Sequence, residues 1–407
     1  MGIFRRSTLL EHIAQIPNKM IPYVKKKLET LGIEKSTEKS WSDLSIDQEL
    51  LDKLKESMDD INKYTNPIVI LPNEKKIVQE IKTSVRKENV NNLTRTSAYL
   101  KVFNKYPEVH WALLAHFVSR NGGWNMTDLK GSILSGFLSE RAQKSYFTFL
   151  ERANAAIFHD AYPQLLLYEA SRRDKKSYSH LLPVFGVSKF MIPIWEEFIR
   201  SKNSKLLTVA LIINEQHYIE ERIVQNHIFQ ENVFNTWQYQ VQEAFHLVHV
   251  LFPYATKSSI RRIAGHKVVN FRNVEERVNI GKQLYLILFG IPVIYKECYF
   301  FAKENPHTGS REDYWPHMFS KGEQIKEEWH SCWDKGKPFM YSPTLTHAWE
   351  NIDNPEPIKG DWYLNKGKEI FKLFESNSMP GSFDVTNEYC KDLYEMNMIA
   401  AVKNTLD

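Results

Sequence analysis

The stretch WALLAHFV (residues 111–118), followed by RNGGWN (residues 120–125), decides the fold class of this chain. Its apolar residues predict a buried helix, because a helix places residues three and four apart on one face. At about 100° per residue, His110 and Asn121 fall on the same side as Leu114 and Phe117, where a core normally excludes polar groups. The stretch therefore predicts a pocket, with the candidate lining residues His110, Arg120, Asn121, Trp124, Asn125 and, from the next helix, Asn154.

The helical pattern extends over most of the chain. From Asn92 to about Tyr299, apolar residues recur every three or four positions and strict alternation is almost absent, which predicts helices rather than strands. Breaks that end or kink these helices are expected at Pro107, Gly122-Gly123, Pro163, Pro183, Pro193, Asn203-Ser204, Pro253 and Pro292. The predicted fold class is all-α, with a compact, irregular multi-helix domain at its centre.

Two flanking regions differ in composition from this helical core, which we place at residues 63–305. Residues 1–62 alternate amphipathic and charged segments and predict an N-terminal helical arm. Residues 306–407 are rich in Pro, Gly and Trp and predict a loop-rich tail, which we expect to pack on the core because its tryptophans need burial. The basic first half of the arm is a solvated extension or, alternatively, a peripheral contact for an anionic membrane surface.

The charge of the chain does not indicate nucleic-acid binding. A net charge of +4 from 53 basic and 49 acidic residues is a weak imbalance. A basic segment around Arg261, Arg262 and Lys267 lacks the interleaved aromatic residues that stack on bases. The expected turn at residues 120–125 has a helix-turn-helix shape, but the helix after it is poor in basic and amide residues. We therefore expect no specific nucleic-acid binding.

Hydropathy and cysteine usage indicate the compartment. The longest apolar run, residues 284–295, is interrupted by Gly290 and Pro292 and is far shorter than the roughly 20 residues of a spanning helix, so no transmembrane segment is expected. The first residues carry no apolar stretch of signal-peptide length. Three widely spaced cysteines, Cys298, Cys332 and Cys390, predict reduced thiols. The prediction is a cytoplasmic protein.

A helix predicted at about residues 206–229 carries the main catalytic candidates. His217 falls in its apolar stripe, with Glu221 one turn further on, and such a pair can orient a general base or ligate a metal. Asp160 lies on an apolar face of the helix expected to end near Pro163, and a buried carboxylate needs a partner. The candidate catalytic residues are thus His217, Glu221 and Asp160. The alternative for each is a structural hydrogen bond within the core.

Two Glu-x-x-His pairs raise the hypothesis of a divalent metal. Glu243 and His246 lie in a helix predicted at about residues 234–252, and Glu327 and His330 repeat the spacing. Such pairs occur in di-metal carboxylate bundles. The candidate ligands are Glu243, His246 and His217. The alternative is a solvated helix face, because Glu243 and His246 oppose the main apolar stripe of their helix.

The run from His110 to His116, followed by residues 120–129, resembles a family of uncharacterised proteins from spore-forming Gram-positive bacteria, known as domain of unknown function 2515. The resemblance covers the chain from about Asn92 to the Trp-rich tail and leaves the arm outside. It implies a bacterial, cytosolic protein. It implies no activity, substrate, cofactor or catalytic residue.

No motif of a known enzyme class accompanies these residues. Gly122-Gly123 lacks the strand, Lys and Ser/Thr of a phosphate loop, and no Gly-x-Ser-x-Gly elbow occurs. The leading hypothesis is a non-catalytic binding or interaction protein with a protein or small-molecule partner, because the tryptophans can serve as interface anchors. The alternative is a small-molecule or metal-dependent enzyme with a His/Glu/Asp/Arg pocket inside the helical core.

Overall fold

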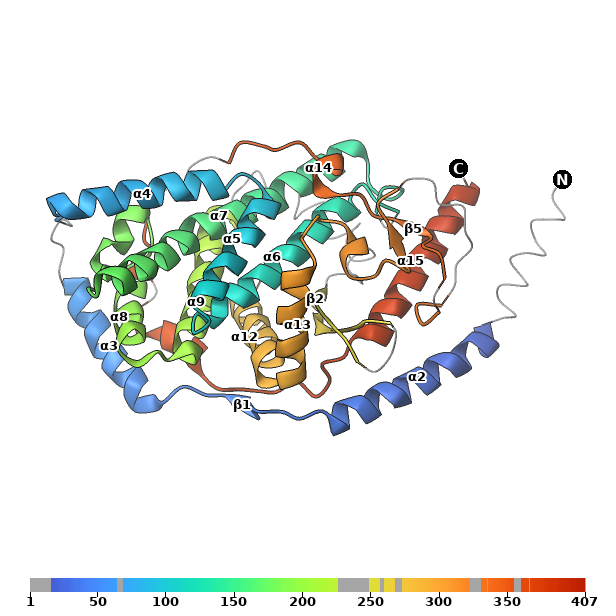
Figure 1. Ribbon diagram of the computed structural model, residues 1–407, viewed down its shortest axis with the longest axis horizontal. Helices are drawn as coiled ribbons and strands as arrows, with labels where there is room; N and C mark the ends of the chain where they lie inside the picture. Colours follow the sequence, from blue (N-terminus) through green and yellow to red (C-terminus); the bar gives the residue numbers. More distant parts are fainter. Residues whose placement is uncertain are drawn as a thin grey trace.

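The computed structural model describes residues 16–63, 69–132, 134–225, 249–256, 260–267, 273–322, 331–334, 336–354, 360–365 and 367–406. Helices dominate the fold (Figure 1). They are α2 (Ile16–Ser36), α3 (Gln48–Lys63), α4 (Pro72–Glu88), α5 (Asn92–Lys105), α6 (His110–Asp128), α7 (Glu140–Asp174), α8 (Met191–Ser201), α9 (Ser204–Ile219), α12 (Val274–Gly290), α13 (Pro292–Glu304), α14 (Leu345–Ala348) and α15 (Thr386–Leu406). The all-α fold class is confirmed.

Short strands and tight helical turns complete the architecture. Antiparallel pairs join β1 (Asp43–Leu44) to β6 (Asn377–Ser378) and β2 (His249–Tyr254) to β3 (Arg262–Lys267), and a parallel pair joins β4 (Phe319–Ser320) to β5 (Met340–Tyr341). The tight turns are 3₁₀ helices at Ser179–Phe185, Arg311–Asp313, Trp362–Asn365 and Gly367–Phe374, and a wider π-helical turn, Glu220–Val224, follows α9. None of these sheets forms a layer, so the core lies between helices.

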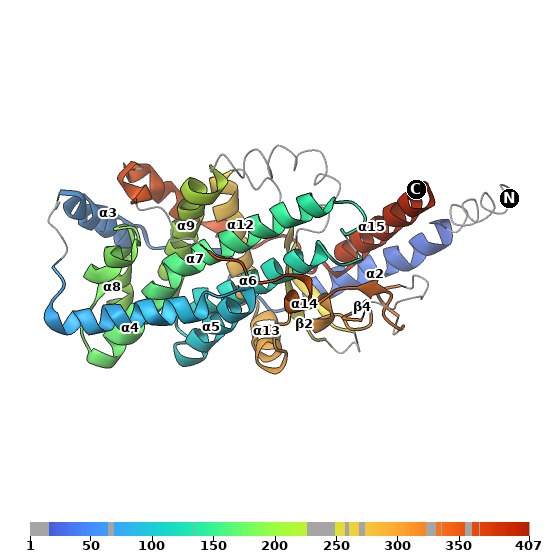
Figure 2. The same ribbon diagram turned by 90° about the horizontal axis from the view of Figure 1, so that it is seen from above.

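Helix α6 occupies the centre of this core. It contacts α5, α7, α9 and α12, and Figure 2 shows α6 and α7 running side by side along the molecule. Leu113 and Phe117 are fully buried, as is Trp124 two turns further on. A helix covered on so many sides keeps its apolar residues out of water whichever face they occupy.

The expected break at Gly122-Gly123 is wrong, because α6 continues through both residues to Asp128. The pair instead allows close packing. A Cβ atom at Gly123 would lie 2.4 Å from Oδ1 of Asn92 and 2.5 Å from Nε2 of His307, distances that no side chain tolerates. Glycine costs helix stability in isolation, and here the tertiary contact requires it.

The expected break at Pro163 is also wrong. Pro163 is buried inside α7, which runs unbroken for 35 residues. A proline removes one helical hydrogen bond, yet packing against neighbouring elements can hold a helix across that gap. Helix α7 contacts α4, α5, α6 and α9 along its length.

The β2–β3 hairpin replaces the C-terminal end of the helix predicted at residues 234–252, and that part of the prediction is wrong. Residues 226–248, which hold the rest of that helix, lie outside the described residues. Gly265 has a φ of 156°, and a Cβ there would lie 2.0 Å from the carbonyl oxygen of Val250. Its N–H points away from β2 and donates to the carbonyl of Phe383 at 2.8 Å.

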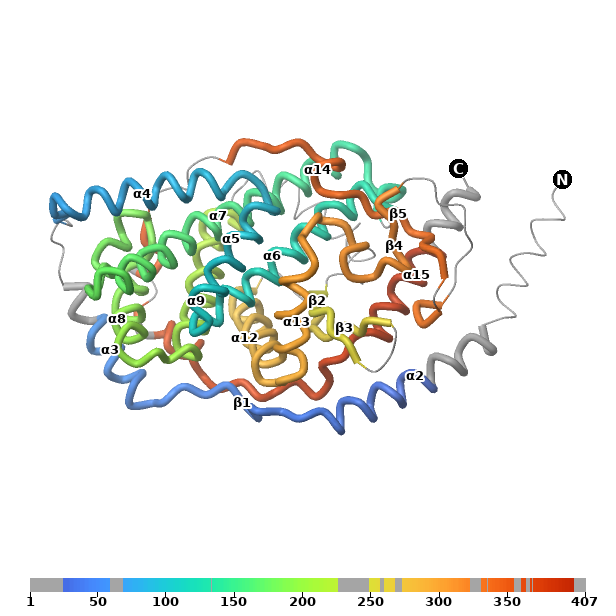
Figure 3. The backbone as a smooth tube through the Cα atoms, viewed as in Figure 1, coloured from blue at the N-terminus to red at the C-terminus, as the bar shows by residue number. Residues whose placement is uncertain are grey.

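The C-terminal region packs on the helical core, as predicted. Trp315 and Trp362 are buried. The ring of Trp349 stacks on Phe147 of α7 with centroids 4.3 Å apart, and its Nε1–H donates to the carbonyl of Met126 at 2.8 Å. Figure 3 shows this region (orange to red) passing over both ends of the helix cluster. The expected boundaries at residues 62 and 305 stay predictions.

The N-terminal arm lies along the core (Figure 1). Oε1 of Glu34 in α2 accepts hydrogen bonds from the backbone N–H groups of Phe383 and Asp384 at 2.8 and 2.9 Å. Thr30, one turn earlier, accepts from Arg262 at 2.6 Å. These contacts tie the arm to both β3 and the segment before α15. Contact of the arm with a membrane surface stays a prediction.

The cysteine prediction is wrong for two of the three residues. Cys332 and Cys390 form a disulfide across 58 residues, which joins the segment before β5 to α15. The two residues are far apart in the sequence, but the fold brings their Cα atoms to 6.0 Å, a distance that a disulfide can span. Cys298 is a free, buried thiol.

Within the described residues, no single helix is long and apolar enough to cross a membrane. Helices α12 and α13 together reach the necessary length and apolar composition, but the chain bends by 91° between them.

Candidate functional site

A cavity of about 290 Å³ lies between α6, α7, α9 and α12. Its lining is predominantly apolar and includes Leu114, Val118, Phe149, Ile157, Ile212 and Leu284. Protein interiors are packed as densely as organic crystals, so a space of this size inside a helical core is an exception that needs a reason.

Each helix presents one regular stripe to the cavity. Helix α9 contributes Ile212, Glu215, Gln216 and Ile219, and α12 contributes Arg277, Ile280, Gly281 and Leu284. Both sets have the i, i+3, i+4, i+7 spacing of a single helix face. At Gly281 a Cβ would lie 2.7 Å from Cγ2 of Ile212, so this glycine sets how closely α9 and α12 approach.

Glu215 is a carboxyl group on the cavity wall. Burial raises its pKa to about 8, although hydrogen bonds from Gln216 and Trp111 favour the ionised form and oppose that rise. Nε2 of Gln216 donates to Oε1 of Glu215 at 3.1 Å. Within the described residues, no Lys or Arg forms an ion pair with Glu215.

Arg277 is the cation on this part of the wall, and its charge is balanced elsewhere. Its Nη2 donates to Oε2 of Glu220 at 2.6 Å, and its Nε donates to Oε1 of Gln216 at 2.8 Å. Gln216 therefore lies between the two charged groups, accepting from Arg277 and donating to Glu215.

Asp128 lines another part of the cavity and is balanced by Arg311. The guanidinium donates to both carboxylate oxygens, from Nε at 2.7 Å and from Nη2 at 2.5 Å. Nη1 of Arg311 donates to the hydroxyls of Tyr314 and Tyr389 at 2.8 and 2.5 Å. Arg311 and Asp128 are both buried, and this two-point geometry is the arrangement that offsets the desolvation of a buried ion pair.

Asn121, Asn125 and Asn154, three of the predicted pocket residues, do line the cavity. The amide of Asn121 is used twice on β2: its Oδ1 accepts from the N–H of Leu251 at 2.9 Å and its Nδ2 donates to the carbonyl of Leu251 at 3.1 Å. Asn154 donates to the carbonyl of Leu150 at 2.8 Å. Asn121 therefore joins α6 to the hairpin.

Arg120 and Trp124 point to the opposite side of α6, toward the segment after α13. Nη1 of Arg120 donates to the carbonyl of Asn305 at 2.8 Å, and Nη2 lies 3.7 Å from the carboxylate of Asp313. Burial lowers the pKa of Arg120 to about 10. The ring of Trp124 lies 4.5 Å from that of Tyr314.

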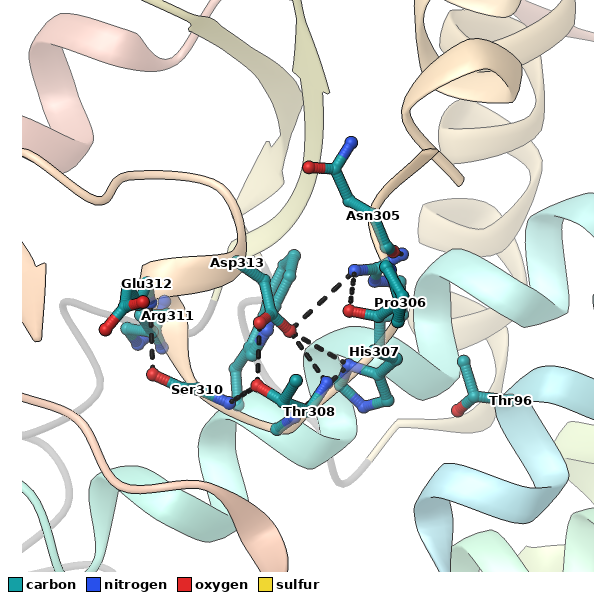
Figure 4. Close-up of polar contacts among 12 residues, drawn as sticks. Thr96, Asn305, Pro306, His307, Thr308, Ser310, Arg311, Glu312 and Asp313 are labelled. Carbon is teal, nitrogen blue, oxygen red and sulfur yellow. Dashed lines mark hydrogen bonds and ion pairs between the residues drawn. The ribbon is translucent and has the colours of Figure 1, made fainter. Parts of the chain in front are cut away.

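A polar cluster lies on this opposite side, and we call it the His307 cluster: Asn92, Arg120, His307, Thr308 and Asp313. Figure 4 shows His307, Thr308 and Asp313 of this cluster. Asp313 accepts from the backbone N–H and the hydroxyl of Thr308 at 2.9 and 2.6 Å. Nδ1 of His307 lies 3.6 Å from the same carboxylate. Asp313 thus contacts both Thr308 and His307 within the cluster.

The protonation of His307 follows from its neighbours. Nδ2 of Asn92 donates to the carbonyl of Ser119 at 2.8 Å, which turns Oδ1 of Asn92 toward Nε2 of His307 at 2.8 Å. Nε2 must therefore carry a hydrogen. Burial lowers the pKa of His307 to about 4, so the ring is neutral at pH 7 and its Nδ1 accepts from the N–H of Gly309 at 3.4 Å. A catalytic serine needs a histidine that accepts the proton of its hydroxyl. Here Nε2 of His307 bonds the side-chain amide of Asn92 and not the hydroxyl of Ser119, so His307 and Ser119 do not form such a pair.

His110 lies at the start of α6, away from the cavity lining. Its ring stacks on Phe289 with centroids 4.0 Å apart, and its Nδ1 lies 2.8 Å from the hydroxyl of Tyr285. Burial lowers the pKa of His110 to about 4.

Asp160 and His217 meet around Trp362 and not in the cavity lining. Oδ2 of Asp160 accepts from Asn214 at 2.5 Å, and Oδ1 of Asn214 accepts from the indole of Trp362 at 3.0 Å. The ring of His217 stacks on Trp362 with centroids 4.7 Å apart. Burial raises the pKa of Asp160 to about 7 despite the hydrogen bond from Asn214.

The remaining candidates are separated from this group. Glu221 is exposed and lies 3.9 Å from Arg222. Glu243, His246, Glu327 and His330 lie outside the described residues. Among the residues that the structure does describe, no three His, Cys, Asp or Glu side chains gather closely enough to hold a metal ion. The catalytic and metal roles of these residues stay predictions.

Glu215, Gln216 and Arg277 are the cavity residues that sequence reasoning missed. Helix α9 is buried on every side from Leu206 to Asn214, so it shows no single apolar stripe from which an inward carboxylate stands out. The useful signal was local. Glu215 stands three residues after Ile212 and four before Ile219, on a face where both neighbours are apolar.

Comparisons with known proteins place the chain without describing an activity. A family model described as "Protein of unknown function (DUF2515)" matches residues 87–386. The uncharacterized protein YppC of Bacillus subtilis (strain 168) is 39% identical over 332 residues, which cover 82% of this chain and 97% of that relative. No solved structure matches.

Proposed function

The chain belongs to this family of proteins of unknown function, DUF2515, and we propose that it is a binding protein for a small, mainly apolar molecule held in the cavity between α6, α7, α9 and α12. The observation that carries the proposal is the cavity itself. Four helices present residues to it at regular helical spacing, and the connection between α6 and α7 adds Leu129, Leu134 and Leu138 to the lining.

The chemistry of the lining supports this proposal. Binding sites for small molecules are typically apolar, with a few polar groups that fix orientation. Here the apolar residues come from every surrounding helix, and Glu215, Gln216, Arg277 and Asp128 supply the polar points. An apolar cavity of about 150 Å³ admits benzene, so the volume here suits a molecule of roughly a dozen non-hydrogen atoms.

A cytoplasmic location belongs to the same proposal. The Cys332–Cys390 disulfide weakens one argument for it, because disulfides are rare in reducing compartments. The test is rapid alkylation of thiols in growing cells, followed by mass spectrometry of peptides containing Cys332 and Cys390. Alkylated cysteines support the cytoplasm, and a fully oxidised pair contradicts it.

Ligand binding is tested by titrating the protein with 1-aminonaphthalene, a neutral fluorescent probe of suitable size. Ala153 lines the cavity from α7, so Ala153→Phe fills part of the space. We expect saturable binding to the wild type and at least roughly tenfold weaker binding to Ala153→Phe, because the ring occupies the volume of the ligand.

Lys144→Phe is the matched control, since Lys144 lies exposed on the same helix. It adds the same ring outside the cavity and should leave binding unchanged. Equal binding by the wild type and Ala153→Phe, or no saturable binding by the wild type, contradicts the proposed function.

A further inference from the structure

Three side chains that can carry a charge, Glu215, Arg277 and Asp128, line the cavity on α9, α12 and α6, and their pairing differs. Arg277 is neutralised by Glu220, and Asp128 is neutralised by Arg311. Glu215 receives hydrogen bonds only from neutral groups, the amide of Gln216 and the indole of Trp111. A carboxylate in a low-dielectric wall without a counter-charge is costly unless a ligand supplies that charge.

Aromatic rings lie beside this carboxyl group. Trp111 and Tyr99 both line the cavity, and their rings meet edge to face with centroids 5.4 Å apart. Aromatic rings attract organic cations. Glu215 accepts a hydrogen bond from the indole of Trp111, so a cation paired with this carboxylate would lie next to that ring. The apolar residues of α6 and α7 then surround the rest of the molecule.

We propose that the cavity binds an apolar organic ammonium ion, with its cationic end paired with Glu215 beside Tyr99 and Trp111 and its apolar body between α6, α7 and α12. This inference rests on the proposed function and adds the class of ligand to it. The one carboxyl group on the described cavity wall without a cationic partner thereby becomes the group that selects the ligand.

The surrounding titratable groups are consistent with this selection. From α5, Tyr99 stays a neutral hydroxyl, because burial raises its pKa well above the ordinary value. From α7, the Asp160 carboxylate acts on Glu215 and adds negative charge. From α12 and α6, Arg277 and Asp128 are each held in an ion pair.

The pH dependence has a defined sign. Burial raises the pKa of the empty site's Glu215 to about 8, so at pH 6 the carboxyl group must lose a proton before it pairs with an ammonium ion. The affinity for the ammonium ion should therefore increase from pH 6 to pH 8, by roughly tenfold or more. Asp160 titrates in the same range and contributes in the same direction.

The experiment compares three competitors of the same length against bound 1-aminonaphthalene: octylammonium, octanol and octanoate. We expect octylammonium to displace the probe at pH 8 at roughly tenfold lower concentration than octanol, and octanoate to be the weakest. Glu215→Gln should remove the difference between octylammonium and octanol while the probe still binds. Glu80→Gln, the same change at an exposed position on α4, should leave it intact.

The outcomes separate this inference from the proposed function. Probe binding with equal displacement by octylammonium and octanol at both pH values, or a preference for octanoate, overturns the ammonium assignment and leaves the cavity as a site for neutral or anionic molecules. Absence of any probe binding overturns the proposed function. The wild-type comparison at pH 6 and pH 8 needs no substitution, so it decides the question even if Glu215→Gln fails to fold.

Discussion

The two sides of α6 differ in how their polar groups are used. None of the residues of the His307 cluster lines the cavity, and we call this side of α6 the filled side. There Arg120 donates to the carbonyl of Asn305, and Asp313 accepts from Thr308 and lies 3.7 Å from Arg120. On the cavity side, space remains, and Glu215 faces it without a counter-charge among the described residues. Both sides are rich in polar side chains, so polarity in a core does not itself mark a binding site.

The two sides differ in whether their polar groups already have protein partners and in whether a cavity lies beside them. A buried polar group whose partners are all protein atoms fixes the fold, since removing a partner leaves the other group unsatisfied. A polar group that faces an open space can bind a ligand that enters that space. Substitutions on the filled side should therefore change stability, and substitutions on the cavity side should change binding.

Arg311→Met should give the largest effect, because it removes the cation from a buried pair and leaves Asp128 uncompensated. We expect a loss of about 3–5 kcal/mol in the free energy of unfolding, measured by urea denaturation. The double variant Arg311→Met/Asp128→Asn should recover part of this loss. A loss below about 1 kcal/mol would contradict the assignment of the pair to the structural framework.

Reduction of the Cys332–Cys390 disulfide should be the next largest effect. Cys390 follows Tyr389, which accepts a hydrogen bond from Arg311, so the disulfide holds α15 against Arg311, two residues from Asp313 of the filled side. Closing a loop of this length stabilises a protein by about 2–4 kcal/mol. Cys390→Ser should lower the free energy of unfolding by that amount, and a reductant added to this variant should cause no further change.

Gly123→Ala should have a smaller effect on the same side. The added methyl group meets Asn92 and His307, and overpacking of this kind costs about 1–3 kcal/mol. Gly32→Ala is the control, because no atom lies within 4 Å of its added Cβ and alanine favours a helix. Thermal unfolding should show a lower midpoint for the first variant and an unchanged or higher one for the second.

On the cavity side, the effect on stability should appear as a pH dependence. Because the folded pKa of Glu215 is raised to about 8, the folded state holds a proton that the unfolded state loses above its ordinary pKa, so stability falls as pH rises from about 4.5 to 8. The slope is below about 1 kcal/mol per pH unit after solvent screening in the cavity. Glu215→Gln should flatten it, and an unchanged slope in denaturation curves would show that Glu215 titrates normally.

Much of the fold follows from the sequence, and the exceptions share a cause. Apolar spacing predicts the helices from α5 to α13, and the tryptophans predict a tail that packs on them. Gly122-Gly123 and Pro163 are the local signals that usually end helices, but tertiary packing overrode both. The β2 strand, residues 249–254, is too short and apolar to be told from the end of a helix by periodicity alone.

The site was predicted only in part for a related reason. Asn121 and Asn154 were predicted because each falls on an apolar helix face, and Asn125 was predicted from the run at residues 120–125. Arg120 and Trp124 belong to the same run but point to the opposite side of α6. A sequence shows that a polar residue is buried but not whether a partner or a space lies opposite. Glu215 escaped detection because α9 is buried all round.

The contacts of Asn121 with Leu251 bear on the edges of the two-stranded β2–β3 ribbon. A two-stranded ribbon has two open edges, and open edges recruit strands from other chains into aggregates. Here the amide of Asn121 occupies the outer N–H and carbonyl of Leu251 in β2, and the carbonyl of Phe383 occupies the outer N–H of Gly265 in β3. The side chain of Asn121 and the carbonyl of Phe383 thus occupy hydrogen-bonding groups in the middle of both edges. An incoming strand could not pair with the ribbon at these positions.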